Sequence, residues 1–159
     1  MIRKLIRKAQ IYRKNSYSPY SHFMVGASLL GEDNKIYGGC NVENSAFGPS
    51  NCAERTAIFK AISEKCTKFH AIAIIGGYEF EKKIVSTYLP PCGMCIQVLK
   101  EFCTPDLQII LAKSPNEYRL MKLDDFYIHK DLQTLNPISE CWQLGNAKNL
   151  SDMAAPHAK

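Results

Sequence analysis

Four residues in two short segments have the types and the spacing of a hydrolytic metal site. Cys52 and Glu54 are two positions apart, and Cys92 and Cys95 form a CxxC pair. Three thiolates suit a zinc ion and leave its fourth tetrahedral position open to water. Glu54 is too close to Cys52 in sequence to share the metal easily, so its carboxylate can lie over the open position and move a proton. The pattern therefore predicts a catalytic zinc site in which Glu54 is the catalytic residue.

Two other uses of the same cysteines remain open at this point. A structural zinc site needs a fourth Cys or His at ligand spacing, and the other cysteines stand apart at positions 40, 66, 103 and 141. A redox dithiol would use the CxxC pair and give no role to Cys52 and Glu54. Arg55 supports the catalytic interpretation, because three thiolates and one zinc ion leave a net negative charge that a hydrogen bond from its guanidinium would offset.

These segments must be positioned by the elements around them. Residues 52–64 and 93–102 have helical spacing, and a helix N-terminus favours a thiolate through its dipole and free N–H groups. The other expected elements are an amphipathic helix near the N-terminus and strands over 23–30, 35–42, 69–75, 107–112 and 119–123. The run 69–75 is apolar throughout, which is typical of a strand buried on both faces. This order predicts an α/β sandwich built on one mixed sheet.

Length, composition and charge exclude several classes of protein. A chain of 159 residues that is 46% hydrophobic suits one folded domain rather than a disordered one. No apolar stretch reaches the roughly 18 residues of a membrane span, and the N-terminus is charged throughout, so we expect a cytoplasmic protein with no membrane partner. The formal net charge is +5, and much of the basic excess lies in the first expected helix, at Arg3, Lys4, Arg7, Lys8, Arg13 and Lys14. We interpret these residues as a solvated helix face rather than a nucleic-acid site.

The combined motifs resemble those of the small homotetrameric zinc-dependent cytidine deaminases. The pattern CxE…PCxxC is the three-cysteine form of the nucleobase deaminase signature. The resemblance runs from about residue 2 to 127 and includes the segments 17–27 (YSPYSHFMVGA), 39–44 (GCNVEN), 51–57 (NCAERTA) and 91–95 (PCGMC). It implies a three-layer α/β/α sandwich with roughly five strands, one Zn²⁺ per subunit, and hydrolytic deamination of cytidine and deoxycytidine in pyrimidine salvage.

The resemblance also assigns roles by position. It implies that Cys52, Cys92 and Cys95 bind zinc and that Glu54 shuttles protons. For the substrate, it implies that the ring of Phe23 packs on the pyrimidine and that Asn41 and Glu43 bind the ribose hydroxyls. Ala53 would lie beside the base. Two aromatic positions would reach a neighbouring subunit's site, Phe47 and Phe126. We therefore expect a homotetramer with shared sites, a small nucleoside as substrate and no nucleic-acid partner.

Some positions depart from the family pattern. Tyr is usual at Phe47, Ser or Thr at Pro90 and Arg at Ile96, so a phenolic hydrogen bond and an ionic contact are lost. The catalytic domain is predicted over 1–128, followed by an extension over 129–159 that is partly helical or loosely ordered. Two alternatives remain, a deaminase of another cytosine nucleoside such as a nucleoside antibiotic, and an inactive zinc-stabilised binding module.

Overall fold

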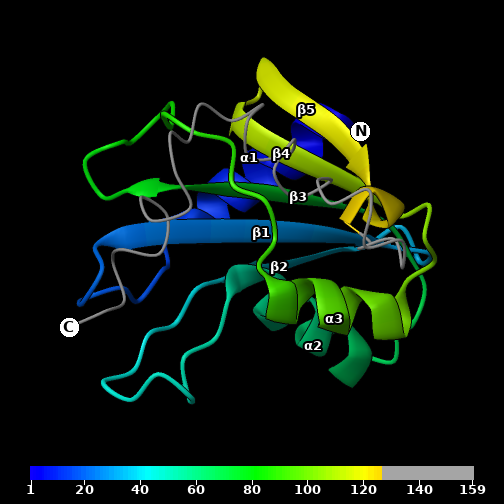
Figure 1. The fold of residues 1–159 in the computed structure, drawn as a ribbon. Helices are drawn as coiled ribbons and strands as arrows, with labels where there is room; N and C mark the ends of the chain where they lie inside the picture. Colours follow the sequence, from blue (N-terminus) through cyan, green and yellow to red (C-terminus); the bar gives the residue numbers. More distant parts are fainter. Residues whose placement is uncertain (127–159) are drawn as a thin grey trace, which may run out of the picture.

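The computed structural model describes residues 1–126, which form a mixed five-stranded sheet with three helices (Figure 1). The strands are β1 (Phe23–Gly31), β2 (Ile36–Cys40), β3 (Phe69–Tyr78), β4 (Gln108–Ser114) and β5 (Glu117–Lys122). The helices are α1 (Ile2–Arg13), α2 (Ala53–Ser63) and α3 (Gly93–Phe102), and a 3₁₀ turn, η1 (Leu123–Phe126), follows β5. The predicted extension over 129–159 lies outside the described residues.

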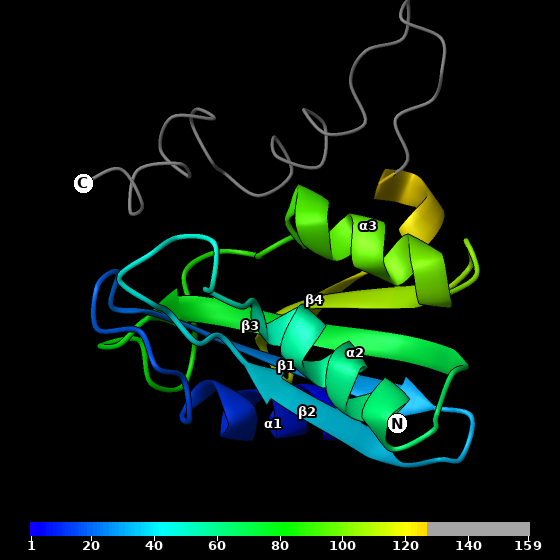
Figure 2. The ribbon, with the colours of Figure 1, turned by 90° about the horizontal axis from the view of Figure 1, so that it is seen from below.

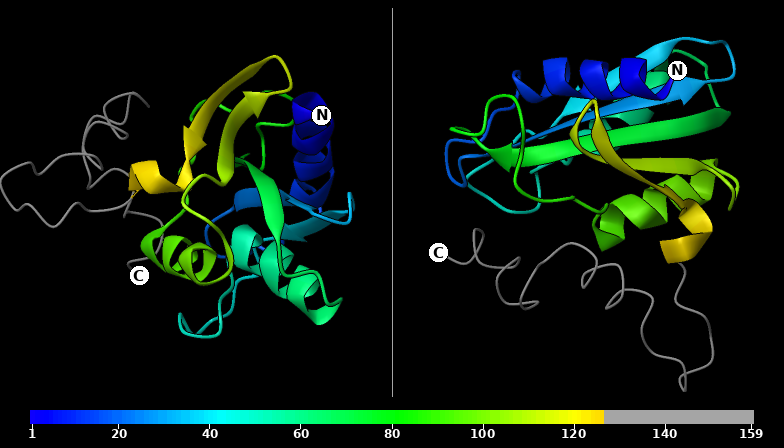
Figure 3. Two further views of the ribbon diagram at one scale, coloured as in Figure 1. Left: turned by 90° about the vertical axis from the view of Figure 1, so that its right-hand side faces the viewer. Right: turned by 90° about the horizontal axis from the view of Figure 1, so that it is seen from above.

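The sheet lies between two helical layers, which confirms the predicted three-layer sandwich. Its strand order is β2-β1-β3-β4-β5, and only the β3–β4 pair is parallel. Figures 2 and 3 show α1 on one face and α2 with α3 on the other. Each face has its own hydrophobic core. Within residues 1–126, none of the helices combines the length and the apolarity that a bilayer crossing requires.

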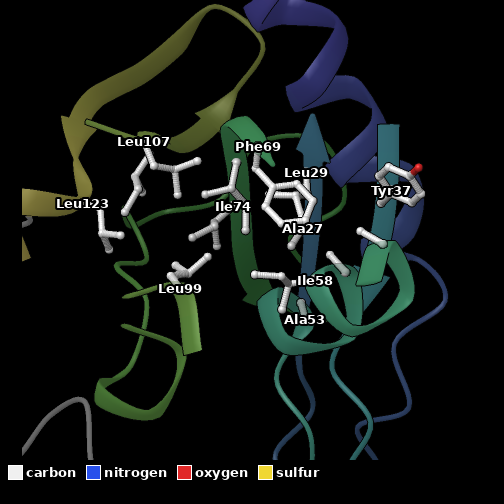
Figure 4. Packing of buried hydrophobic residues seen from close by; sticks show 14 of the residues in the cluster. Ala27, Leu29, Tyr37, Ala53, Ile58, Phe69, Ile74, Leu99, Leu107 and Leu123 are labelled. Carbon is white, nitrogen blue, oxygen red and sulfur yellow. The ribbon is translucent and has the colours of Figure 1, made fainter. Parts of the chain in front are cut away.

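The core on the α2 and α3 side holds the two site-bearing helices against the sheet. Its residues come from both layers: Ala27, Leu29 and Ile74 from the strands, Ile58 from α2 and Leu99 from α3 (Figure 4). Ile58 and Ile74 are fully buried. Burial of a side chain of this size stabilises a fold by about 1.5–3 kcal/mol. The N-termini of α2 and α3 are thereby fixed relative to one another.

Several strand ends differ by one to three residues from the sequence-based expectation, and those of β3 and β2 have a clear cause. β3 continues past residue 75 to Tyr78, because Gly76 and Gly77 extend its antiparallel pairing with β1. β2 ends at Cys40 rather than at residue 42. The side chain of Asn41 accounts for this early end, because its Oδ1 accepts a hydrogen bond from Val25 N at 2.8 Å and its Nδ2 donates to Phe23 O at 2.8 Å. The amide oxygen thus takes the place of the Asn41 carbonyl in the pairing with β1, while Asn41 N still donates to Val25 O at 3.2 Å.

Arg13 corrects the interpretation of the first helix as having a uniformly solvated basic face. Arg13 is only 7% exposed. The guanidinium donates to Met24 O at 3.0 Å, to Tyr78 O at 2.7 Å and to Glu81 O. It therefore joins the end of α1 to the start of β1 and to the end of β3, where residues 79–87 begin.

The carboxylate of Glu81 completes this arrangement. Its oxygens accept hydrogen bonds from Tyr78 N at 2.8 Å and from Ser86 N at 2.7 Å. Burial alone would raise the pKa of Glu81, but the hydrogen bonds from Ser86 and Tyr78, together with the charge of Arg13, leave that pKa below its ordinary value of 4.5. The charged carboxylate of Glu81 therefore binds both ends of the loop over 78–86.

Candidate metal centre and active site

The three cysteines of the predicted metal site meet where α2 and α3 begin. Cys52 is the N-cap residue of α2, Cys92 is the N-cap residue of α3, and Cys95 lies in the first turn of α3. Their sulfur atoms all lie within 4.8 Å of one another, with 3.8 Å between Cys52 and Cys92 and 3.4 Å between Cys92 and Cys95. Two segments forty residues apart in sequence therefore supply one compact set of thiols.

This set fits a zinc ion. A tetrahedral ion with zinc–sulfur bonds of about 2.3 Å separates two of its sulfurs by about 3.8 Å, close to the distances observed. Among residues 1–126, no fourth Cys, His, Asp or Glu joins the cluster, which leaves one coordination position for water or substrate. Cys92 is exposed whereas Cys95 is buried, so the cluster lies at the boundary between the surface and the core. The third thiol also distinguishes the cluster from a CxxC redox pair.

Arg55 faces the same sulfurs from the first turn of α2. Its Nη2 donates to Cys52 Sγ at 3.6 Å and to Ser50 O at 3.3 Å. Its Nε is buried and has no hydrogen-bond partner among the described residues. A half-buried guanidinium with one unpaired N–H group is stabilised by a site with excess negative charge, as three thiolates around a divalent ion would provide.

The thiols influence one another's protonation. Hydrogen bonds from Cys52 and Cys95 lower the pKa of Cys92, with a further contribution from N–H groups at the start of α3. The donated hydrogen bonds and burial raise the pKa of Cys95. The cluster therefore contains one sulfur that readily becomes a thiolate and is the natural starting point for metal binding.

Glu54 is buried beside this cluster, with only 4% of the residue exposed. Burial raises the pKa of Glu54 to about 7, and the nearby Cys92 sulfur adds to this shift. The carboxyl group can therefore either hold or release a proton near neutral pH. It also belongs to the same helical turn as Cys52, so the helix that supplies a ligand also supplies the proton carrier.

The close approach of α2 to β2 depends on Gly39. A Cβ atom added at Gly39 would lie 2.4 Å from Ala53 O and 2.5 Å from Ala57 N, both in the backbone of α2. Ala53 itself is fully buried. A residue without a side chain on β2 is therefore required for α2, with Cys52 and Glu54, to lie directly on the sheet.

The residues expected to contact the nucleoside lie at the start of β1, just after β2 and at the start of α2. Phe23 is partly buried, and its ring packs edge-on against Tyr78 with 5.2 Å between ring centroids. Asn41 and Glu43 directly follow β2. The side chain of Asn41 forms hydrogen bonds with the backbone of Phe23 and Val25 in β1. The carboxylate of Glu43 accepts from the backbone N–H groups of Tyr20 and Ser21, just before β1. The side chains of Asn41 and Glu43 therefore hold by hydrogen bonds the backbone segment that carries Phe23, and we call these three residues the rim.

The two aromatic residues expected at a neighbouring site have different surroundings. Phe47 is 69% exposed on the loop over 43–50, which extends from the body of the subunit (Figure 1). That loop is closed at its base by paired hydrogen bonds between Val42 and Asn51. Phe126 is 5% exposed and packs in the core of its own subunit. A contact of either ring with another subunit stays a prediction.

Sequence reasoning missed several residues that organise the site. Thr56 Oγ1 accepts from Asn51 Nδ2 at 3.1 Å and lies 3.1 Å from Cys52 O and 3.0 Å from Cys40 O, so it ties the first ligand to the end of β2. Ser21 and Arg13 were also missed. Arg13 had a readable signal, because it lies four residues after Ala9 on the apolar stripe of its helix.

Comparisons with known proteins agree with this geometry. The sequence matches the profile described as the cytidine and deoxycytidylate deaminase zinc-binding region over residues 1–111, which include all three sulfurs. The chain belongs to this family. It is 46% identical over 111 residues to a cytidine deaminase of Sporosarcina psychrophila, covering 70% of this chain and 76% of that protein. It is also 38% identical over 112 residues to a probable cytidine deaminase of Dictyostelium discoideum, covering 70% and 71%.

Solved structures of the deaminase family have the same fold. The crystal structure of a cytidine deaminase from Burkholderia pseudomallei aligns with a TM-score of 0.68 at 39% identity, covering 77% of this chain and 92% of that one. A cytidine deaminase from Mycobacterium tuberculosis aligns with a TM-score of 0.63 at 32% identity, covering 79% and 96%. Family membership and the three clustered thiols together identify zinc as the metal of this deaminase-family site.

Proposed function

We propose that this protein catalyses the zinc-dependent hydrolytic deamination of cytidine and deoxycytidine. Water replaces the amino group at C4 of the base, giving uridine or deoxyuridine and ammonia. The observation that carries the proposal is the buried Glu54 carboxyl group in the first turn of α2, beside three clustered thiols. That arrangement supplies a metal site and a proton carrier side by side, in a chain of the deaminase family.

Cys52, Cys92 and Cys95 hold the metal in this proposal. Bound zinc acts as a Lewis acid that makes water acidic enough to attack at neutral pH. Arg55 offsets the excess charge of the thiolates through its contact with Cys52 Sγ. Without this donor the sulfurs would neutralise the ion more fully and weaken it as a Lewis acid.

Glu54 moves the protons. It takes a proton from the attacking water and delivers it to N3 of the pyrimidine. It then takes the second proton of that water from the new hydroxyl on C4 and delivers it to the departing amine, which leaves as ammonia. A carboxyl group whose pKa lies near 7 can perform both the uptake and the release at neutral pH. Positioned acid–base catalysis of this kind contributes about 10²–10⁴-fold to the rate.

The substrate is held by residues at the start of β1, just after β2 and at the start of α2. The Phe23 ring packs on the base, Asn41 and Glu43 bind the sugar hydroxyls, and Ala53 lies beside the base at the start of α2. These contacts place C4 over the metal, which is the positional part of catalysis. A paired amide and carboxylate suits the adjacent hydroxyls of an unmodified ribose.

Assembly belongs to the same proposal. The protein acts as a cytoplasmic homotetramer in pyrimidine salvage, with a small nucleoside as its substrate. The exposed Phe47 ring on a loop that extends beyond the subunit supports a site shared between subunits. Phe126 would need partial withdrawal from its core to contribute. Sedimentation should show a tetramer, and a fully active monomer would contradict the shared site.

Turnover and metal content test the proposal together. Cytidine, deoxycytidine and free cytosine are incubated with the purified protein, and loss of the cytosine ultraviolet absorbance is followed. We expect both nucleosides to be consumed. Glu54→Gln should retain one zinc ion per subunit but lose turnover by at least about 10²-fold. No loss of absorbance from any of the three compounds would instead indicate an inactive binding module.

A further inference from the structure

One serine hydroxyl links two parts of the proposed nucleoside site. Ser21 Oγ contacts Glu43 Oε1, and it also accepts a hydrogen bond from Phe23 N at 3.0 Å. Glu43 is the proposed ligand of the sugar, and Phe23 is the proposed platform for the base. The two functions, which come from different segments of the chain, therefore share a single side chain between them.

The direction of this link follows from the groups involved. An ionised carboxylate can only accept, and a backbone N–H can only donate. The hydroxyl proton of Ser21 is therefore donated to Glu43, and an oxygen lone pair receives the N–H of Phe23. The other carboxylate oxygen, Oε2, accepts from Tyr20 N at 3.1 Å and from Ser21 N at 3.2 Å. Both oxygens of Glu43 are thus directed by the turn that contains Ser21.

The turn itself is held in an uncommon conformation. His22, between Ser21 and Phe23, has φ of 55°, in the left-handed region that non-glycine residues seldom occupy. Its N–H donates to Ser18 O at 3.0 Å, and its carbonyl accepts from Glu79 N at 3.0 Å. A backbone conformation of this kind persists when the surrounding contacts determine it, and such conformations cluster at ligand sites.

We propose that Ser21 is a positioning residue that aligns the Glu43 carboxylate for the sugar hydroxyls relative to the Phe23 ring. This inference rests on the proposed function. Without the Ser21 hydroxyl, Oε1 of Glu43 loses its fixed donor and can turn to solvent, while the base platform and the metal site remain. The loss therefore falls on recognition of the sugar rather than on chemistry at C4.

The test compares a nucleoside that has the sugar hydroxyls with one that lacks them. For the wild type and each variant, kcat/KM is measured for cytidine and for 2′,3′-dideoxycytidine. A hydrogen bond to a charged group is worth roughly 10- to 100-fold in an equilibrium constant. We expect Ser21→Ala to reduce the preference for cytidine by about tenfold, mainly through KM, with kcat and zinc content near those of the wild type.

Three further variants separate positioning from general loss of structure. Ser21→Thr keeps the hydroxyl and should restore the preference, whereas Ser21→Cys keeps the size with a weaker donor and should give an intermediate value. Ser18→Ala removes a hydroxyl from the same loop that makes no hydrogen bond to Glu43 or Phe23 among the described residues, and should leave the preference unchanged. A general effect on folding would lower activity on both nucleosides equally.

Binding provides a second readout that does not need turnover. In a Glu54→Gln background, calorimetry gives Kd for the same two nucleosides with and without Ser21→Ala. An unchanged ratio of the two Kd values, or an equal change caused by Ser18→Ala, would overturn the role of Ser21. A wild-type protein that deaminates neither nucleoside would instead overturn the proposed function, and the Kd ratio would still decide on Ser21.

Discussion

Replacing Arg13 by Met should lower the free energy of unfolding more than the same replacement of any other basic residue in α1. The guanidinium donates to three backbone carbonyls, those of Met24, Tyr78 and Glu81. A buried carbonyl left without a partner costs about 1–3 kcal/mol. Tyr78 O keeps a second donor, Glu81 N at 2.9 Å, so the carbonyls of Met24 and Glu81 set a minimum near ~2 kcal/mol. The removed charge also leaves the Glu81 carboxylate without its nearby cation. We therefore expect a loss of about 2–4 kcal/mol in the free energy of unfolding.

Equilibrium unfolding in urea, followed by far-ultraviolet circular dichroism, measures this loss. Protein and zinc concentrations must be the same for each variant, because assembly and metal binding shift apparent stability. Arg7→Met is the matched control, since Arg7 lies on the exposed face of the same helix. Arg13→Lys keeps the charge but not the three-way geometry and should recover only part of the loss. An Arg13→Met protein within about 1 kcal/mol of the control would refute the reasoning, because surface substitutions usually fall within about 0.5 kcal/mol.

Three further predictions concern the site, the acid range and the thiols. Gly39→Ala should lift α2 from the sheet, because the new Cβ would lie 2.4 Å from Ala53 O, and should lower zinc content and turnover together; wild-type zinc content in this variant would contradict the packing argument. Glu81 has a lowered pKa in the fold, so its contribution to stability is complete above its ordinary value of 4.5 and declines as the pH falls through the folded pKa. Unfolding measured from pH 7 to 3 should therefore show the gap between wild type and Glu81→Gln closing on the acid side, and a constant gap would exclude this role. Burial raises the pKa of Cys103 to about 12, whereas the pKa of the exposed Cys92 thiol is lowered. A chelator should therefore let iodoacetamide modify Cys92 while Cys103 stays unmodified, as mass spectrometry of the alkylated peptides would reveal.

The metal site was readable from sequence because its information is local. Two short segments place ligands at fixed offsets from helix starts, and those offsets determine which side chains share one turn. Cys52 with Glu54, and Cys92 with Cys95, needed only the correct expectation of two helices. The central strands of the sheet were equally readable, since a continuous apolar run of this length in a small domain is typical of a strand buried on both faces.

The contacts that organise the rim could not be read in the same way. Arg13, Ser21 and Thr56 bind backbone carbonyls, N–H groups and a carboxylate that come from distant segments, and no spacing rule specifies these partners. A basic residue at the end of an amphipathic helix is ordinarily solvated, and here tertiary contacts with two strand ends reverse that expectation. Asn41 likewise ends β2 early because its side chain competes with the backbone for the same partners on β1.

The two helix starts have a consequence for the order of events during synthesis. Neither α2 nor α3 has a side-chain hydrogen bond at its N-cap, and in both helices the N-cap residue is a metal ligand. Cys92 leaves the ribosome forty residues after Cys52, a delay of about 2–8 s at ordinary translation rates. The strand β3 lies between the two helices in the chain, so it is synthesised before the three sulfurs can meet. Binding of one ion by all three sulfurs is therefore a late event in synthesis, which follows the start of α3.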